Sequence, residues 1–113
     1  MDRQQMQRVK TLLEIRQHEL RLSIEHNLHY ARRAEPEPDT VDQAANGFEK
    51  ESLLRRSSQE QLLLRAIESA LGRIRDGTYG KCLSCGKEID KKRLGTVPWA
   101  LHCIQCEEEF ERW

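Results

Sequence analysis

Cys82-Leu-Ser-Cys85 and Cys103-Ile-Gln-Cys106 are two Cys-x-x-Cys motifs that hold all four cysteines of this 113-residue chain. Each motif can turn two sulfurs toward one point, and the separation of the motifs fits a four-thiolate zinc site. Gly86 supplies the backbone freedom that a tight turn after the first motif needs. We therefore predict one zinc ion per chain, held by Cys82, Cys85, Cys103 and Cys106. Because protein fills every ligand position, no position stays open for water or substrate, and the zinc is structural.

Two other uses of paired cysteines compete with zinc. Disulfide bonds are disfavoured because the sequence shows no secretory signal. A thioredoxin-like redox pair is disfavoured because it requires a strand–helix context, which the sequence around Cys82 and Cys103 does not show. A sensor of oxidants or zinc that acts through its thiols stays open as an alternative function.

The composition limits the classes of function. Charged residues make up 34% of the chain and hydrophobic residues 37%, which favours a small fold stabilised by a metal. The 19 basic and 19 acidic residues cancel, whereas a protein that held DNA through many phosphates would carry a basic excess. No apolar run approaches the roughly 20 residues that span a membrane, so we expect a cytoplasmic protein. The sequence shows no nucleophile–base pair and no glycine-rich phosphate loop, which argues against an enzyme.

The chain before the cysteines favours two long helices. Residues 2–33 contain no glycine or proline and are rich in Gln, Arg, Glu and Leu, which are good helix formers. The two prolines in 34–40 break this pattern, and Asp39 or Thr40 can cap a second helix over 41–75. Two long helices joined by a short turn form an antiparallel hairpin.

The whole chain is therefore predicted to be mainly α-helical. We expect a long antiparallel helical hairpin (a coiled coil), then a small four-cysteine zinc-finger module and a short C-terminal helix over 104–113. The predicted domains are the hairpin at 1–76, with an acidic tip at 35–44, and the zinc finger with its C-terminal helix at 77–113. The aromatic residues expected to cover the join between the two are Trp99, Phe110 and Trp113.

Apolar residues recur at steps of three, four or seven along both helices, as in a helix–helix seam. They are Met6, Val9, Leu13, Leu20, Ile24 and Leu28 in the first helix, widened by Leu12 and Ile15, and Phe48, Leu53, Leu63, Ile67, Ala70 and Ile74 in the second. The middle of the second helix, residues 55–61, is polar, and we expect it to face Arg16, Gln17 and His18. This region forms either a packed polar layer or a solvated bend.

Further motifs extend the pattern beyond the cysteines. Asp39-x-x-Asp42-x-Ala44 stands at the turn between the helices. The zinc module adds Gly77-x-Tyr-Gly80 before the first cysteine pair, then Gly86, Ile89, Arg93-Leu94 and Pro98 before the second. The pattern closely resembles the DksA/TraR family, bacterial transcription factors whose zinc finger is made of four cysteines. The resemblance covers most of the chain.

The resemblance implies a function. In that family the hairpin enters the secondary channel of RNA polymerase, and the protein does not bind DNA. This chain would therefore be a zinc-stabilised transcription regulator that binds RNA polymerase, with the tip residues Asp39, Asp42 and Ala44 near the polymerase active site. The zinc module and terminal helix would rest on the rim of the channel, where the candidate contacts are Lys91, Lys92 and Arg93.

The resemblance also implies a weak response to the alarmone guanosine tetraphosphate. Larger members of the family bind it through basic residues, and by ungapped alignment Ala66, Val97 and Glu107 fill three of these positions here. We expect a monomer with no specific DNA or membrane partner. The alternative from another class is a zinc-stapled coiled-coil interaction protein, which a pull-down with RNA polymerase would distinguish.

Overall fold

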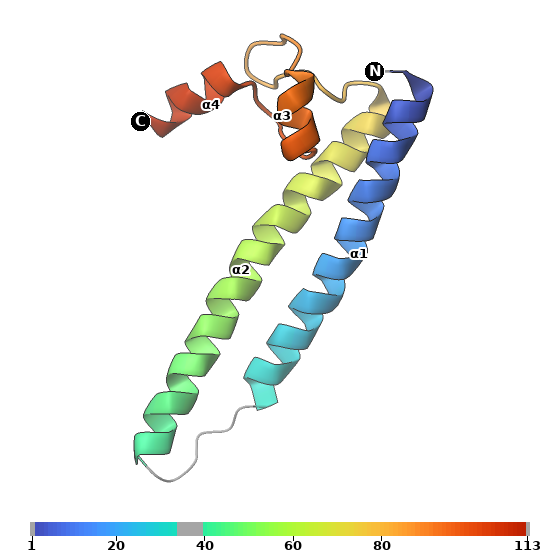
Figure 1. Cartoon of the computed structure of the whole chain (residues 1–113). Coiled ribbons are helices and arrows are strands. Elements are labelled where there is room, and N and C mark those ends of the chain that lie inside the picture. The colour runs from blue at the N-terminus through green and yellow to red at the C-terminus, as the bar shows by residue number, and fades with distance from the viewer. Residues whose placement is uncertain (1, 34–39, 113) are drawn as a thin grey trace. The chain divides into compact units, whose positions relative to one another are not determined.

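The computed structural model describes residues 2–33 and 40–112, with side chains at 2–32 and 47–112. The described residues contain four helices, which are α1 (Arg3–Arg33), α2 (Thr40–Asp76), α3 (Lys91–Thr96) and α4 (Ile104–Glu111), as Figure 1 shows. No β-strand occurs in these ranges; Lys81 and Glu88 form an isolated antiparallel bridge. The predicted mainly helical fold, with a hairpin, a four-cysteine module and a short last helix, is confirmed.

The helix ends follow from local sequence. At the start of α1, the N–H of Gln5 donates to Asp2 Oδ1 at 2.7 Å, and the N–H of Asp2 donates to Gln5 Oε1 at 3.2 Å. This reciprocal pair satisfies N–H groups that the first helical turn leaves without partners. At the end of α2, Gly77 has a φ of 79°. Its N–H and that of Thr78 donate back to carbonyls in the last turn of α2, which is the Schellman arrangement.

The chain forms two compact units, one made of Met1–Gln17 with Arg65–Trp113 and the other of His18–Leu64. In each unit, a segment of α1 lies beside an antiparallel segment of α2 (Figure 1). The buried apolar seam is made of Leu13, Ile67 and Ala70 in the first unit, and of Leu20, Ile24 and Ala31 in the second. The two units are regions of compact packing and do not test the predicted domain boundary. The division into domains at residue 77 therefore stays a prediction.

The apolar seam is narrower than predicted. Leu12 is 60% exposed, Ile15 is 52% exposed and Phe48 is 69% exposed, so these side chains do not belong to the packed face. Phe110 is also exposed and contacts the His102 ring, with 4.9 Å between ring centroids, instead of covering a join. Trp113 lies outside the described residues. The three-to-four-residue period identified the stripe but overestimated its width.

The polar middle of α2 is a packed layer. α2 runs without interruption through 55–61, and Ser57 is only 1% exposed. Across the seam, Asn27 Nδ2 donates to Glu60 Oε1 at 3.4 Å. The prediction that Arg16, Gln17 and His18 face this region is therefore wrong, because the partner segment lies about ten residues further along α1. The apolar period shows which face of a helix is buried, but it does not fix the axial alignment of two helices.

Candidate metal centre

The four cysteine sulfurs form one cluster. The Sγ atoms of Cys82, Cys85, Cys103 and Cys106 all lie within 4.8 Å of one another, and none of the four is in a disulfide. The Sγ atoms of Cys85 and Cys103 are 3.8 Å apart. A tetrahedron with zinc–sulfur bonds of about 2.3 Å has edges of about 3.8 Å, so the cluster fits zinc. It is too wide at this pair for an S–S bond, which is about 2.05 Å long.

A tight backbone turn shapes the first Cys-x-x-Cys motif. The N–H of Gly86 donates to the carbonyl of Cys82 at 3.0 Å, and the N–H of Cys82 donates to the carbonyl of Lys87 at 2.8 Å. Gly86 has a φ of 75°, in the left-handed region that favours glycine. The turn therefore directs both thiols of the motif to the same side, and Gly86 has the role that the sequence predicted for it.

The second motif combines a loop residue with a helical one. Cys103 is the N-cap of α4, and the N–H of Glu107 donates to its carbonyl at 3.0 Å, so Cys106 lies in the first turn of the helix. The N–H of Leu83 donates to the carbonyl of Leu101 at 2.9 Å, which connects the first motif to the segment just before the second. The predicted start of the terminal helix inside the second motif is confirmed.

The electrostatics of the cluster favour a bound cation. Burial alone would raise the pKa of the Cys82 thiol, but hydrogen bonds from the backbone N–H groups of Cys85, Cys103 and Ser84, with one from the Cys106 thiol, lower it to about 5. The pKa of Cys106 is raised by its hydrogen bonds to the Cys82 and Cys103 sulfurs and by burial. Backbone N–H groups thus stabilise a thiolate at Cys82, and the thiolate is the form in which cysteine binds zinc.

Arg73 connects the end of α2 to the loop that leads into the cluster. Its side chain is 9% exposed, and its Nη2 donates to the carbonyl of Thr78 at 3.2 Å and to that of Lys81. Tyr79, from the same loop, donates its hydroxyl to the carbonyl of Pro98 at 2.8 Å. These bonds satisfy loop carbonyls that have no helix or sheet partner. Sequence reasoning missed Arg73, since a basic residue near a helix end commonly serves only the helix dipole.

The three basic residues of α3 that the sequence suggested as contacts, Lys91, Lys92 and Arg93, differ in their exposure. Asp90 caps this helix by accepting from the N–H of Lys92 at 3.2 Å, and Leu94 is buried beneath it. Lys91 and Lys92 are exposed. Arg93 is partly buried and its Nε donates to the carbonyl of His102 at 3.2 Å, so Arg93 supports the zinc module from within.

The predicted tip falls largely outside the described side chains. Asp39 is not among the described residues. Asp42 and Ala44 lie in the first two turns of α2, where the structure describes the backbone alone.

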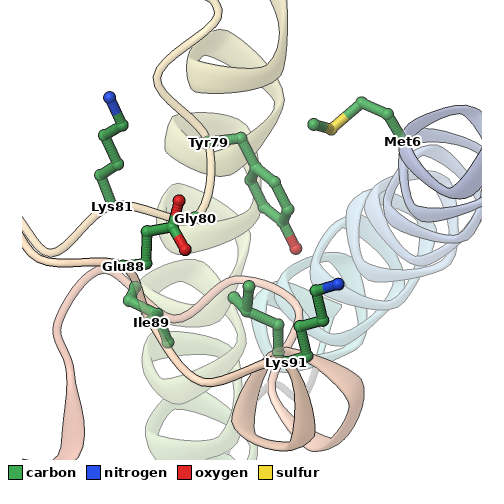
Figure 2. A pocket seen from close by; sticks show the side chains of 8 residues that line it. Met6, Tyr79, Gly80, Lys81, Glu88, Ile89 and Lys91 are labelled. Atoms are coloured by element: carbon green, nitrogen blue, oxygen red, sulfur yellow. The ribbon is translucent and has the colours of Figure 1, made fainter. Parts of the chain in front are cut away.

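A small pocket lies beside the zinc module. Figure 2 shows Met6 of α1, Tyr79 and Lys91 around it, and its other lining residues are Gly80, Lys81, Glu88, Ile89 and Leu94. Its volume is about 90 Å³, well below the roughly 300–1,000 Å³ of typical ligand pockets. The pocket is too small for a nucleotide.

None of the helices in the described part of the chain has both the length and the apolar character of a membrane span.

Known proteins resemble this chain both in sequence and in structure. Residues 77–112 match the prokaryotic dksA/traR C4-type zinc finger. The chain is 36% identical to the RNA polymerase-binding transcription factor DksA of Salmonella typhimurium over 94% of its own length and 71% of that protein. It is 45% identical to an uncharacterized protein of Aquifex aeolicus over 58% of its own length, spanning less than half (45%) of that protein. The transcription factor DksA2 from Pseudomonas aeruginosa has a similar structure, with a TM-score of 0.84, 33% identity, and coverage of 99% of this chain and 87% of that one.

Proposed function

The chain belongs to the DksA/TraR family of C4-type zinc-finger proteins, and we propose that it is a transcription regulator that binds bacterial RNA polymerase in the cytoplasm. The observation that carries the proposal is the match to DksA proteins over 94% of this chain, which includes both long helices and the zinc module. The printed names of these relatives describe RNA polymerase-binding transcription factors. The neutral net charge favours contact with the polymerase over contact with DNA.

The four cysteines supply the structural part of this function. Cys82, Cys85, Cys103 and Cys106 hold one zinc ion, whose bonds to four thiolates keep the loop, α3 and α4 in one arrangement. No ligand position is left for a substrate, so the zinc supports a binding protein and not an enzyme. Within this module, Lys91 and Lys92 are free to contact acidic groups of the polymerase, whereas Arg93 is engaged with His102.

In the proposed function, the helical hairpin is the part of the protein that acts on the polymerase. We propose that a single copy inserts its helices into the polymerase secondary channel, with Asp39, Asp42 and Ala44 at the leading end. A pair of helices is a stiff rod that is narrow enough for a pore. Carboxylates at its end can compete for basic groups or perturb a magnesium site near the polymerase active centre.

The test replaces one tip carboxylate by its neutral amide. The Asp42→Asn variant should lose the effect on transcription by purified bacterial RNA polymerase but keep most of its binding, since the affinity comes from the helix sides and the zinc module. Loss of the helix-dipole interaction in the first turn should cost at most about 1 kcal/mol of stability. Asp76→Asn, at the exposed opposite end of α2, is the matched control. Full regulation by the Asp42→Asn variant would refute the tip assignment, and absence of polymerase binding by the parent would refute the function.

A further inference from the structure

One layer of the α1–α2 seam in the unit His18–Leu64 is polar. Asn27 is 8% exposed and donates to Glu60 Oε1, and Arg56 Nε lies 3.5 Å from the same oxygen. Ser57 is 1% exposed, and its hydroxyl has no hydrogen-bond partner among the described residues. Apolar side chains would stabilise such buried positions more, because burying polar groups with incomplete partners is unfavourable. Stability alone therefore does not account for this layer.

A polar layer can determine how two helices align along their axes. An apolar seam that repeats every three or four residues can slide by that step and still bury its apolar side chains. The bond between Asn27 and Glu60 forms in one alignment only, and a slip of three residues in one direction would place Glu60 opposite the buried side chain of Ile24. A single polar pair in a coiled-coil seam selects the register in this way.

The register determines how far α2 extends beyond the end of α1. With Asn27 opposite Glu60 in antiparallel helices, the last residue of α1, Arg33, lies opposite about residue 54 of α2. Because α2 begins at Thr40, its first turns have no α1 segment beside them, and Figure 1 shows this overhang. Residues 47–52 are all exposed, as expected for a helix segment with no part of α1 beside it.

We infer that Asn27 and Glu60 are positioning residues that fix the length of this overhang, and with it the presentation of the tip. The inference rests on the proposed function, since Asp42 and Ala44 lie in the overhanging turns. A slip of three or four residues would move the end of α1 by about 5 Å along α2, at about 1.5 Å per residue. The tip would keep its sequence but present a different shape to the polymerase.

The first experiment measures the register itself. Spin labels are introduced as noncanonical amino acids at the exposed positions Tyr30 and Leu54, which leaves the cysteines free to bind zinc. The parent should show one narrow distance distribution. The Asn27→Leu/Glu60→Leu variant should show a broad distribution or a second maximum, with a thermal midpoint equal to or above that of the parent. His26→Leu/Gln59→Leu, at exposed neighbouring positions, is the matched control and should keep the narrow distribution.

The second experiment connects register to regulation. The Leu/Leu variant should lose most of its effect on transcription although it is no less stable, which a purely structural role of the pair would not produce. The exchanged pair Asn27→Glu/Glu60→Asn retains a polar pair in the layer and should restore both the narrow distribution and regulation. If the Leu/Leu variant does not fold, Asn27→Ala/Glu60→Ala gives the same comparison. A single unshifted distance in the apolar variant overturns the inference, whereas the Asp42→Asn result judges the proposed function separately.

Discussion

Removing zinc should unfold residues 78–112 and leave α1 and α2 largely helical. The large buried side chains of this region are Tyr79, Ile89 and Leu94. Burying one such side chain contributes about 1.5–3 kcal/mol, so the three supply about 5–9 kcal/mol. Zinc binding to finger peptides supplies about 10–16 kcal/mol at neutral pH, so the metal is the larger contribution. Without it, the apolar contacts do not offset the entropy of ordering this loop-rich segment.

The expected loss of helix can be read from the helix lengths. α3 and α4 contain 6 and 8 residues, against 31 in α1 and 37 in α2. A strong chelator should therefore remove about one sixth of the helical signal in far-ultraviolet circular dichroism, and added zinc should restore it. Both tryptophans of the chain, Trp99 and Trp113, lie in 78–113, so tryptophan fluorescence should shift to the red in the same titration.

Two substitutions at neighbouring positions of the first Cys-x-x-Cys motif test whether the effect of the chelator comes from loss of zinc. Cys85→Ser removes one zinc ligand and should reproduce the effect of the chelator without any added reagent. Ser84→Ala changes an exposed residue of the same motif and should leave zinc content and fluorescence unchanged. Loss of half or more of the helical signal would show that α1 and α2 depend on the metal, which refutes the reasoning. Absence of zinc from protein prepared without chelator would refute the site itself.

Two further predictions concern the seam and the alarmone. Ile67→Ala, at a side chain with 0% exposure, should lower the free energy of unfolding by about 2–5 kcal/mol in urea titrations. Leu62→Ala, at 65% exposure, is the control and should change it by no more than about 0.5 kcal/mol. Equal effects of the two substitutions would show that the seam is misplaced. Guanosine tetraphosphate should change regulation of the polymerase little, because Ala66, Val97 and Glu107 supply no cation for its phosphates, and Glu107 Oε2 instead lies 3.7 Å from His102 Nδ1. Saturable enhancement at micromolar nucleotide would contradict this and indicate a displaced site near Lys91 and Lys92.

Features that depend on neighbouring residues could be predicted from the sequence. The ends of α1 and α2 fall within two residues of the expected positions, because proline, glycine and capping residues act within one turn. The four sulfurs meet as expected, since Cys-x-x-Cys spacing and Gly86 constrain the backbone locally. The short helix α3 was not predicted, because six residues are too few for a periodic signal. Its formation depends on the Asp90 cap and on burial of Leu94.

Features that depend on contacts between distant segments could not be predicted in this way. Leu12 and Ile15 have the correct period for the seam yet are exposed, since the second helix covers only part of the apolar surface of the first. Phe48 is exposed because it lies where α2 extends beyond the end of α1. The alignment of Asn27 with Glu60 depends on a contact between residues 33 apart in sequence. Arg73 was missed for the same reason, because its carbonyl partners are provided by the folded loop.

The two compact units are stabilised by different interactions, and this difference bears on function. The bonds of Arg73 to the carbonyls of Thr78 and Lys81 lie within the unit that also contains the cysteines, so they connect the end of α2 to the loop that leads to the metal ligands. The unit His18–Leu64 has no cysteine and no metal cluster among its described residues, and its described buried side chains lie in the seam. A purely apolar seam would hold its helices together without fixing their alignment. If the chain acts as proposed, with its tip at one depth in the polymerase, it needs a determinant of register within that unit, and the Asn27–Glu60 layer is suited to that role.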